Sequence, residues 1–128
     1  KMKKVVFLLM ALLLTTGFSM AQDQQRAIIS AENAMHDFGV IKESAGKVTH
    51  VFVIKNDGTM PLVMTRVIAS CGCTTPEWTK EPIAPGKTGQ VKVTFNPEGR
   101  PGPFAKTISV YSNGRSGSFV LTIRGEVK

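Results

Sequence analysis

Catalytic signatures are scarce in this chain of 128 residues. Only 9 residues are Asp or Glu, and they are scattered, so the sequence offers no paired carboxylates for general acid–base catalysis. Serines are plentiful, yet none lies in the Gly-x-Ser-x-Gly turn that exposes a hydrolase nucleophile. The triplet Asp37-Phe38-Gly39 spells the magnesium-binding motif of protein kinases, but the chain is far too short and lacks their glycine-rich and catalytic loops. We therefore expect a protein that is not an enzyme of these classes.

Beyond the first four residues, the chain has no segment in which charge of one sign is concentrated. Lys and Arg number 16 against 9 Asp and Glu, and three of the lysines stand among the first four residues. The other 13 basic residues are spread singly from Arg26 to Lys128. A nucleic-acid interface has clustered basic residues with aromatic residues between them, and aromatics make up only 7% of this sequence. We therefore expect a solvated exterior and no nucleic-acid partner.

The N-terminus has the pattern of a secretory signal peptide. Three lysines among the first four residues precede an unbroken apolar run of ten, residues 5–14. Ser19-Met20-Ala21 then offers small residues at the two positions that a signal peptidase reads. The apolar run is well short of the roughly 20 residues that span a bilayer. We expect a signal peptide over residues 1–21, cleavage after Ala21 and, without a cysteine at that site, no lipid anchor.

Cleavage leaves a mature chain of a size that suits one domain with one hydrophobic core. We expect an N-terminal linker over residues 22–30 and the domain over residues 31–128. Export would place the protein in the periplasm or outside the cell, with no membrane span in the mature chain. Disulfides persist there, but the chain has only 2 cysteines. Two cysteines make no disulfide framework, so burial of apolar side chains must hold the fold together.

Short β-rich runs separated by turn residues fill the mature chain, and no window of ten or more residues has a helical period. Within residues 47–55, Phe52 and Ile54 share one face, while Val51 and Val53 share the other. The predicted strands cover residues 27–31 and 34–41 (a first strand broken in the middle), 47–55, 62–70, 90–96, 106–112 and 118–127, with a short extended piece at Trp78 and a loop over 97–103. This pattern predicts an all-β, antiparallel β-sandwich of about seven strands.

Glycines mark three predicted irregularities. Gly39 suggests a bulge or kink in the first strand. Gly58, in the turn Asn56-Asp57-Gly58-Thr59, is expected to take a positive φ. Pro85-Gly86 fits the two central positions of a type II turn.

Several motifs occur in an order that resembles one known family. They are Asp37-Phe38-Gly39, Asn56-Asp57-Gly58, Ser70-Cys71-Gly72-Cys73-Thr74, Glu81-Pro82-Ile83-Ala84-Pro85-Gly86, Val93-Thr94-Phe95-Asn96, Gly102-Pro103-Phe104, Lys106-Thr107-Ile108, Tyr111-Ser112-Asn113 and the closing run from Leu121 to Val127. Together they resemble the exported bacterial family called domain of unknown function 1573, over roughly residues 31–127. The resemblance implies an immunoglobulin-like sandwich related to the Hydin-type and major-sperm-protein-type domains. It implies no particular activity, and a fold alone does not assign one.

The two cysteines are the first candidates for chemistry because a single glycine separates them. In a structural interpretation, which we favour, Cys71 and Cys73 shape a loop as a local bridge, as small buried side chains or as a pair between chains. In a redox interpretation, the short ring of a Cys71–Cys73 disulfide is strained and therefore exchangeable. No basic residue is adjacent to stabilise a thiolate, since Arg66 and Lys80 are the nearest in sequence.

A soft metal is the third interpretation of the cysteine pair. Two thiolates are too few for structural zinc, which takes four ligands, whereas Cu(I) accepts fewer ligands and favours sulfur. Nearby methionines and the two histidines, His36 and His50, offer further ligands, although His50 also suits the apolar face of its strand. The candidate copper ligands are Cys71, Cys73, Met60 and His50.

Two aromatic residues, Trp78 and Phe104, fall in segments that the pattern assigns to loops or short extended pieces. Exposed aromatics mark binding surfaces, but these two also suit the ends of a sandwich, which they would plug. We expect an exported, non-catalytic module without a cofactor, whose partner is a protein or another component of the cell envelope. The alternative is a thiol-redox or copper-binding protein that acts through Cys71 and Cys73.

Overall fold

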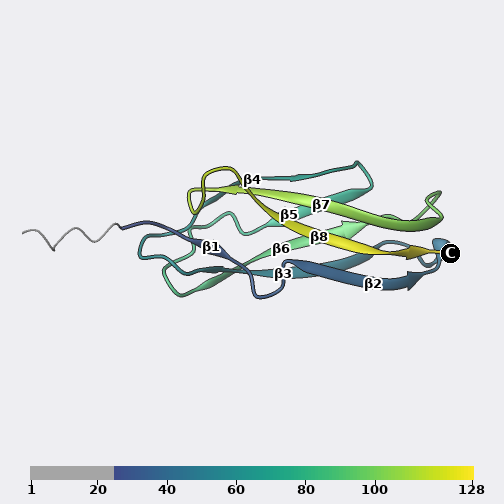
Figure 1. The fold of residues 1–128 in the computed structure, drawn as a ribbon, viewed down its shortest axis with the longest axis horizontal. Helices are drawn as coiled ribbons and strands as arrows, with labels where there is room; N and C mark the ends of the chain where they lie inside the picture. Colours follow the sequence, from purple (N-terminus) through teal and green to yellow (C-terminus); the bar gives the residue numbers. More distant parts are fainter. Residues whose placement is uncertain (1–24) are drawn as a thin grey trace, which may run out of the picture.

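Two four-stranded β-sheets packed face to face make up the fold, as a computed structural model that describes residues 25–128 shows (Figure 1). One sheet has the order β1-β3-β6-β5 and the other β2-β8-β7-β4. The strands are β1 (Ile29–Ser30), β2 (Met35–Ile41), β3 (Val48–Asn56), β4 (Met64–Ala69), β5 (Thr74–Trp78), β6 (Thr88–Phe95), β7 (Gly102–Ser112) and β8 (Ser118–Val127), and a 3₁₀ turn, η1, covers Glu43–Ala45. The predicted signal peptide, residues 1–21, lies outside the described residues.

The predicted all-β sandwich is confirmed, with eight strands and one parallel pair. Strand β2 runs parallel to β8, whereas the other paired strands are antiparallel. The predicted first strand is divided between the two sheets, because β1 pairs with β3 and β2 pairs with β8. Between them the chain crosses from one sheet to the other at Glu32-Asn33. This crossing leaves most of β3 without a neighbour on one side.

The core lies between the sheets and takes its side chains mainly from the four central strands. The predicted inward face of β6 is confirmed, since Val91, Val93 and Phe95 are fully buried. Phe52 and Ile54 of β3 join them from the same sheet, and Ile108, Val110, Leu121 and Ile123 come from β7 and β8. Each large apolar side chain buried in this way stabilises the fold by about 1.5–3 kcal/mol. Ala27 and Ile29, in the predicted N-terminal linker, are also buried in this core.

Two of the three glycine predictions are confirmed and one is wrong. Gly39 has φ 70° at a register shift between β2 and β8, as expected for a bulge. Gly86 has φ 76°, which suits the predicted turn after Pro85. Gly58 does not have a positive φ. It is required for a different reason: a Cβ at Gly58 would lie 2.6 Å from the backbone nitrogen of Ile28.

The two ends of the described chain lie at opposite ends of the long axis (Figure 1). Among residues 25–128, no helix has the length and apolar character needed to cross a membrane.

Candidate functional site

The Cys71-Gly72-Cys73 segment forms the turn that carries the chain from β4 to β5, from the edge of one sheet to the edge of the other. Cys71 and Cys73 are joined by a disulfide, and their Cα atoms are 5.3 Å apart. Cys73 is buried, with 4% of its surface exposed, whereas Cys71 is only partly buried. The turn therefore buries Cys73 in the core and leaves Cys71 the more exposed of the two residues.

Hydrogen-bond donors surround both sulfurs. The backbone N–H of Cys73 donates to Cys71 Sγ at 3.2 Å. Thr74 Oγ1 lies 3.6 Å from Cys73 Sγ and 3.9 Å from Cys71 Sγ. Thr74 is only 4% exposed. A buried hydroxyl is thus directed at the disulfide, a feature that the sequence pattern did not reveal.

The four candidate copper ligands are not brought together. Cys71 and Cys73 are bonded to each other and offer no free thiolate. Met60 lies in the loop before β4, with 44% of its surface exposed. It is separated from the cysteines by the length of β4, about 20 Å for a strand of this size. Within residues 25–128 no group of three His, Cys, Asp or Glu side chains could hold a metal ion.

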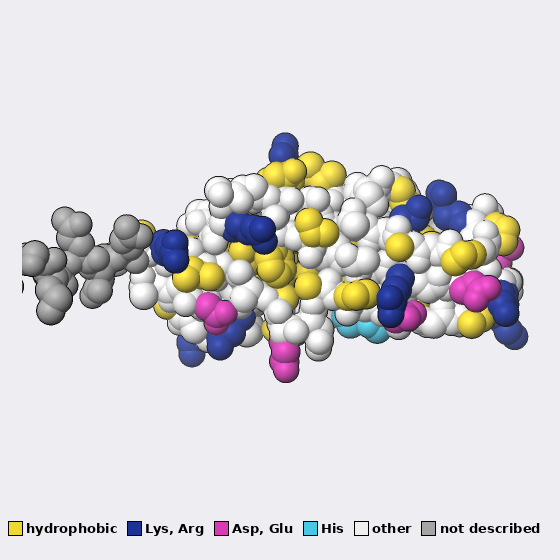
Figure 2. Space-filling view, in the orientation of Figure 1, with side chains coloured by type: hydrophobic (Ala, Val, Ile, Leu, Met, Phe, Trp, Pro, Cys, Tyr) yellow, Lys and Arg dark blue, Asp and Glu magenta, His cyan; other side chains and the backbone are white. Residues whose placement is uncertain are grey.

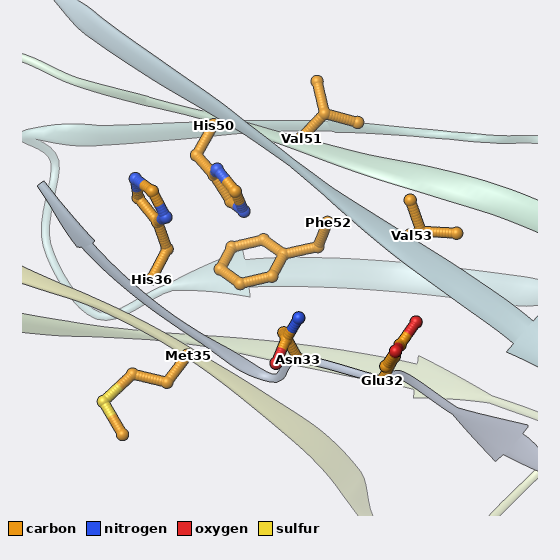
Figure 3. A pocket seen from close by; sticks show the side chains of 8 residues that line it. All are labelled: Glu32, Asn33, Met35, His36, His50, Val51, Phe52 and Val53. Atoms are coloured by element: carbon orange, nitrogen blue, oxygen red, sulfur yellow. The ribbon is translucent and has the colours of Figure 1, made fainter.

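His50 lies on β3 and contacts His36 of β2 rather than the cysteines. The two imidazole rings stack with centroids 3.7 Å apart and planes 7° apart. Phe38 and Phe52 extend the stack on either side, each with an edge-to-face contact to its neighbouring histidine. Figure 3 shows His36 and His50 facing each other across the gap between their strands, with Met35 directed away from them. The stack closes the side of the sandwich between β2 and β3.

Trp78 and Phe104 both lie in strands, β5 and β7, so the loop position expected for Phe104 is wrong. β7 begins at Gly102 because Pro103 and Phe104 continue the ladder with β8. Phe104 is half-buried and stacks on Phe95 with ring centroids 4.1 Å apart. The Trp78 indole N–H donates to the Met64 carbonyl oxygen at 3.3 Å, which ties β5 to β4.

The edge of β5 is protected from pairing with another chain. Asn96 N–H donates to Cys73 O at 2.9 Å, and Thr79 N–H donates to Gln90 O at 3.0 Å, so the backbones of Cys73 and Thr79 face β6. Successive residues of a strand direct their backbone groups to opposite sides, and by this alternation Pro76 faces the free side of β5. Proline has no N–H, and a proline on an edge strand prevents further pairing.

The edges of β4 and β2 are modified in other ways. β4 is short and lies beside β5, to which the Trp78 indole joins it. β2 is distorted by the bulge at Gly39, whose N–H donates to Asp37 Oδ1 at 2.8 Å. The side chain of Asp37 also pairs with Arg124 of β8 at 3.2 Å. Bulges and charged side chains are common means of protecting an edge.

The edge of β3 has neither a bulge nor a proline between Val48 and Ile54. Asn56 N–H donates to Lys87 O at 3.1 Å, so Asn56 faces β6, and by alternation the backbones of Thr49, Val51 and Val53 face the other way. On that side β1 pairs only with Lys55 and Asn56. No strand of the described part of the chain pairs with the remaining stretch.

The free edge of β3 carries apolar side chains and a cavity. Val51 and Val53 point outward with 39% and 53% of their surfaces exposed. A cavity of about 230 Å³ lies between this edge and the crossing segment and is lined by Glu32, Asn33, Met35, His36, His50, Val51, Phe52 and Val53 (Figure 3). Two exposed β-branched residues on the solvent side of the predicted strand were a signal of this surface in the sequence. The sequence held no signal that this part of β3 lacks a neighbouring strand, because that depends on where β1 ends.

Lysines surround the free edge of β3. Lys47 precedes the strand, Lys55 lies on it, and Lys92 of β6 lies directly beside Val51. Two of these lysines have acidic neighbours: Lys55 pairs with Asp57 at 3.5 Å, and Lys92 is opposite Glu77 of β5. On the face of the molecule in Figure 2, basic and acidic side chains are likewise interspersed.

Comparison with solved structures finds a similar fold in several other proteins. A protein of unknown function from Porphyromonas gingivalis W83 is 17% identical, with a TM-score of 0.69 over 86% of this chain and 51% of that one. The VesB protease of Vibrio cholerae is 17% identical, with a TM-score of 0.59 over 80% of this chain and 32% of that one. The secreted serine protease VesC of the same organism is 13% identical, with a TM-score of 0.56 over 81% of this chain and 23% of that one.

These likenesses show the fold alone, because the identities are low. The chain spans about half of the Porphyromonas protein, at 51%, and smaller parts of the two proteases. No curated protein matches the sequence. The family model described as "Protein of unknown function (DUF1573)" matches residues 29–127, which confirms the resemblance noted from the motifs. The chain therefore belongs to the DUF1573 family.

Proposed function

We propose that this protein is an exported, non-catalytic binding module of the cell envelope, in the periplasm or outside the cell. It binds an extended segment of a protein partner, which adds as a strand to the free edge of β3. The unpaired backbone of Thr49, Val51 and Val53 is the observation that carries the proposal. Strand addition to an exposed sheet edge is a common mode of peptide recognition, in which backbone hydrogen bonds provide affinity and alternate side chains provide specificity.

The charges near the edge favour a foreign segment over a second copy of this chain. Two copies of β3 paired antiparallel about Val51 would place Val53 opposite Thr49 and would bring Lys47 of each copy close to Lys55 of the other, where β1 already pairs with Lys55. Like charges brought together at both ends would destabilise this pairing. An added segment with β-branched residues in its centre and acidic residues at its ends would instead meet Val51 and Val53 with apolar contacts and the lysines with opposite charge.

Short synthetic peptides test this proposal even though the partner is unidentified. The probe is the peptide Glu-Val-Thr-Val-Thr-Val-Glu, and binding is measured by calorimetry and by chemical-shift changes. We expect the shifts to concentrate on Thr49, Val51 and Val53. A peptide with lysines at both ends should bind at least about tenfold more weakly. A peptide that is N-methylated on alternate residues lacks every second N–H group. It should not bind in the register in which those groups would donate to the backbone of β3.

A matched pair of variants tests the protein side of the contact. Val51→Pro removes an N–H that faces away from β6, so the β3–β6 ladder is retained while the edge is blocked. Val51→Thr keeps the N–H and a β-branched side chain. We expect Val51→Pro to abolish peptide binding while the variant still unfolds cooperatively on heating. We expect Val51→Thr to bind the peptide as the unmodified protein does. Equal binding by both variants, or shifts on another edge, would contradict the proposal.

Export itself is tested on the full chain. Expressed with its first 21 residues in a bacterial host, the protein should be recovered outside the cytoplasm with Gln22 at its N-terminus. Retention in the cytoplasm at full length would refute this part of the proposal.

A further inference from the structure

We propose that Cys71–Cys73 is an exchangeable disulfide that accepts two electrons from an external dithiol, with Cys71 as the sulfur that is attacked. The bridge joins residues separated by a single glycine in one turn. Closing so short a loop removes little conformational freedom from the unfolded chain. The turn is also held without it, because β4 pairs with β7, β5 pairs with β6, and the Trp78 indole bonds to Met64 O. A purely structural bridge would therefore contribute little at this position.

Thr74 is the residue that favours the reduced state. Its hydroxyl is buried, and the hydrogen-bond contacts it makes among the described residues are to Cys71 Sγ and Cys73 Sγ. A disulfide sulfur is a weak acceptor, whereas a thiolate is a charged and much stronger one. The Thr74 hydroxyl is consequently better satisfied after the bridge opens. The backbone N–H of Cys73, which donates to Cys71 Sγ, acts in the same direction.

The two sulfurs differ in access, and this difference sets the direction of the reaction. Cys71 is only partly buried, whereas Cys73 has 4% of its surface exposed, so Cys71 is the more accessible of the two residues. Attack in line with the sulfur–sulfur bond therefore takes place on Cys71 Sγ, and Cys73 Sγ is the leaving group. Thr74 Oγ1, at 3.6 Å, donates to the thiolate that forms there.

The exchange balances in two steps. A thiolate of the external dithiol bonds to Cys71 Sγ, the Cys71–Cys73 bond breaks, and Cys73 Sγ takes the electron pair and leaves as a thiolate that accepts the Thr74 hydrogen bond. The second thiolate of the same dithiol attacks its partner's sulfur in the mixed disulfide and releases the thiolate of Cys71, which Cys73 N–H stabilises. The external dithiol leaves as a disulfide, and both cysteines are reduced. The co-reactant is any accessible dithiol in an exported protein or a small dithiol.

Equilibration of the folded protein with mixtures of reduced and oxidised dithiothreitol tests the proposal. The reduced fraction is measured by alkylation and mass, and the fold is followed by circular dichroism. We expect reduction to occur without loss of the fold. Thr74→Val, which removes the hydroxyl and keeps the shape, should shift the equilibrium towards the disulfide by about 2- to 10-fold, the value of one hydrogen bond. Thr74→Ser, which keeps the hydroxyl, should return it to the original value.

Single-cysteine variants test the direction of attack. Cys73→Ser leaves Cys71 free and should form a mixed disulfide with oxidised glutathione at least about tenfold faster than Cys71→Ser does, because a thiol on the surface reacts faster than a buried one. Three results would overturn the proposal: a bridge that is reduced only when the protein unfolds, faster reaction at Cys73, or the same redox equilibrium for Thr74→Val as for the unmodified protein. The strand-addition proposal is unaffected by any of them, because it rests on β3.

Discussion

At the scale of single residues, Gly58 lies in a turn that was predicted correctly for a reason that is wrong. The turn after β3 was expected from Asn56-Asp57-Gly58, and a positive φ was the expected reason for the glycine. The structure gives a steric reason instead, because the N-terminal segment passes directly over Gly58, where a Cβ would meet the Arg26 carbonyl oxygen and the backbone of Ile28. The buried amide of Asn56 orders the same turn by accepting Gly58 N–H at 2.9 Å and donating to Met60 O and Ile83 O.

The two explanations for Gly58 predict different substitutions. Asparagine tolerates a positive φ, so a purely conformational requirement would allow Gly58→Asn at little cost. The close approach of Arg26 and Ile28 forbids any side chain, and we expect Gly58→Asn and Gly58→Ala each to lower the free energy of unfolding by about 1–3 kcal/mol. Denaturant unfolding measures this. Gly86→Asn is the matched control, because Gly86 has φ 76° and nothing within 4 Å of its Cβ position. A Gly58→Asn variant as stable as Gly86→Asn would contradict the steric explanation.

At the scale of elements, the strands were predictable and their neighbours were not. The alternation of Val91, Val93 and Phe95 indicated β6 because inward and outward positions differ in polarity. Residues 27–41 gave two short runs, but nothing local to them states that β1 joins one sheet and β2 the other. Pairing is decided by packing between distant segments. The free edge of β3 was missed for this reason, whereas the position of Cys71-Gly72-Cys73 at a strand end was evident from the chain itself.

The link between β4 and β5 is an element-scale feature that a single substitution can test. Trp78→Phe keeps an aromatic side chain and removes the indole N–H that bonds to Met64 O. We expect the free energy of unfolding to fall by about 0.5–1.5 kcal/mol, the usual value of one hydrogen bond. Amide exchange should quicken most in β4 and β5, as measured by nuclear magnetic resonance.

The same Trp78 variant separates a structural role from a binding role. Trp78 was considered as a binding-surface aromatic, and it also has Lys80 Nζ 2.9 Å from its ring centroid. If Trp78 stabilises the β4–β5 side and the partner binds at β3, Trp78→Phe should bind the peptide probe with unchanged affinity. Loss of peptide binding with unchanged stability would assign Trp78 to the interface instead.

At the scale of the whole molecule, the two long sides of the sandwich are closed by different chemistry. On the β4–β5 side, the disulfide turn and the Trp78 hydrogen bond join the sheets and do not titrate between pH 5 and 8. On the β2–β3 side, the stacked rings of His36 and His50 join them, and the pKa of His50 is lowered from its usual 6.5. The charged groups near this stack are Glu32, which lines the cavity, and Asp37, which neighbours His36. The β2–β3 side should therefore be the one that responds to acid.

The direction of the acid response follows from the pKa of His50. Burial is the larger cause and the nearby His36 the smaller cause of a pKa below the usual 6.5. Above pH 6.5 His50 is neutral in both states, and its contribution to stability is complete. As the pH falls below 6.5 the unfolded chain binds the proton more readily than the folded one, so stability is lost until the pH has passed the lowered folded pKa. We expect a lower melting temperature at about pH 5 than at about pH 7.5. His50→Phe, which retains a ring and cannot titrate, should reduce this difference, whereas an unchanged difference would place the acid sensitivity elsewhere in the molecule.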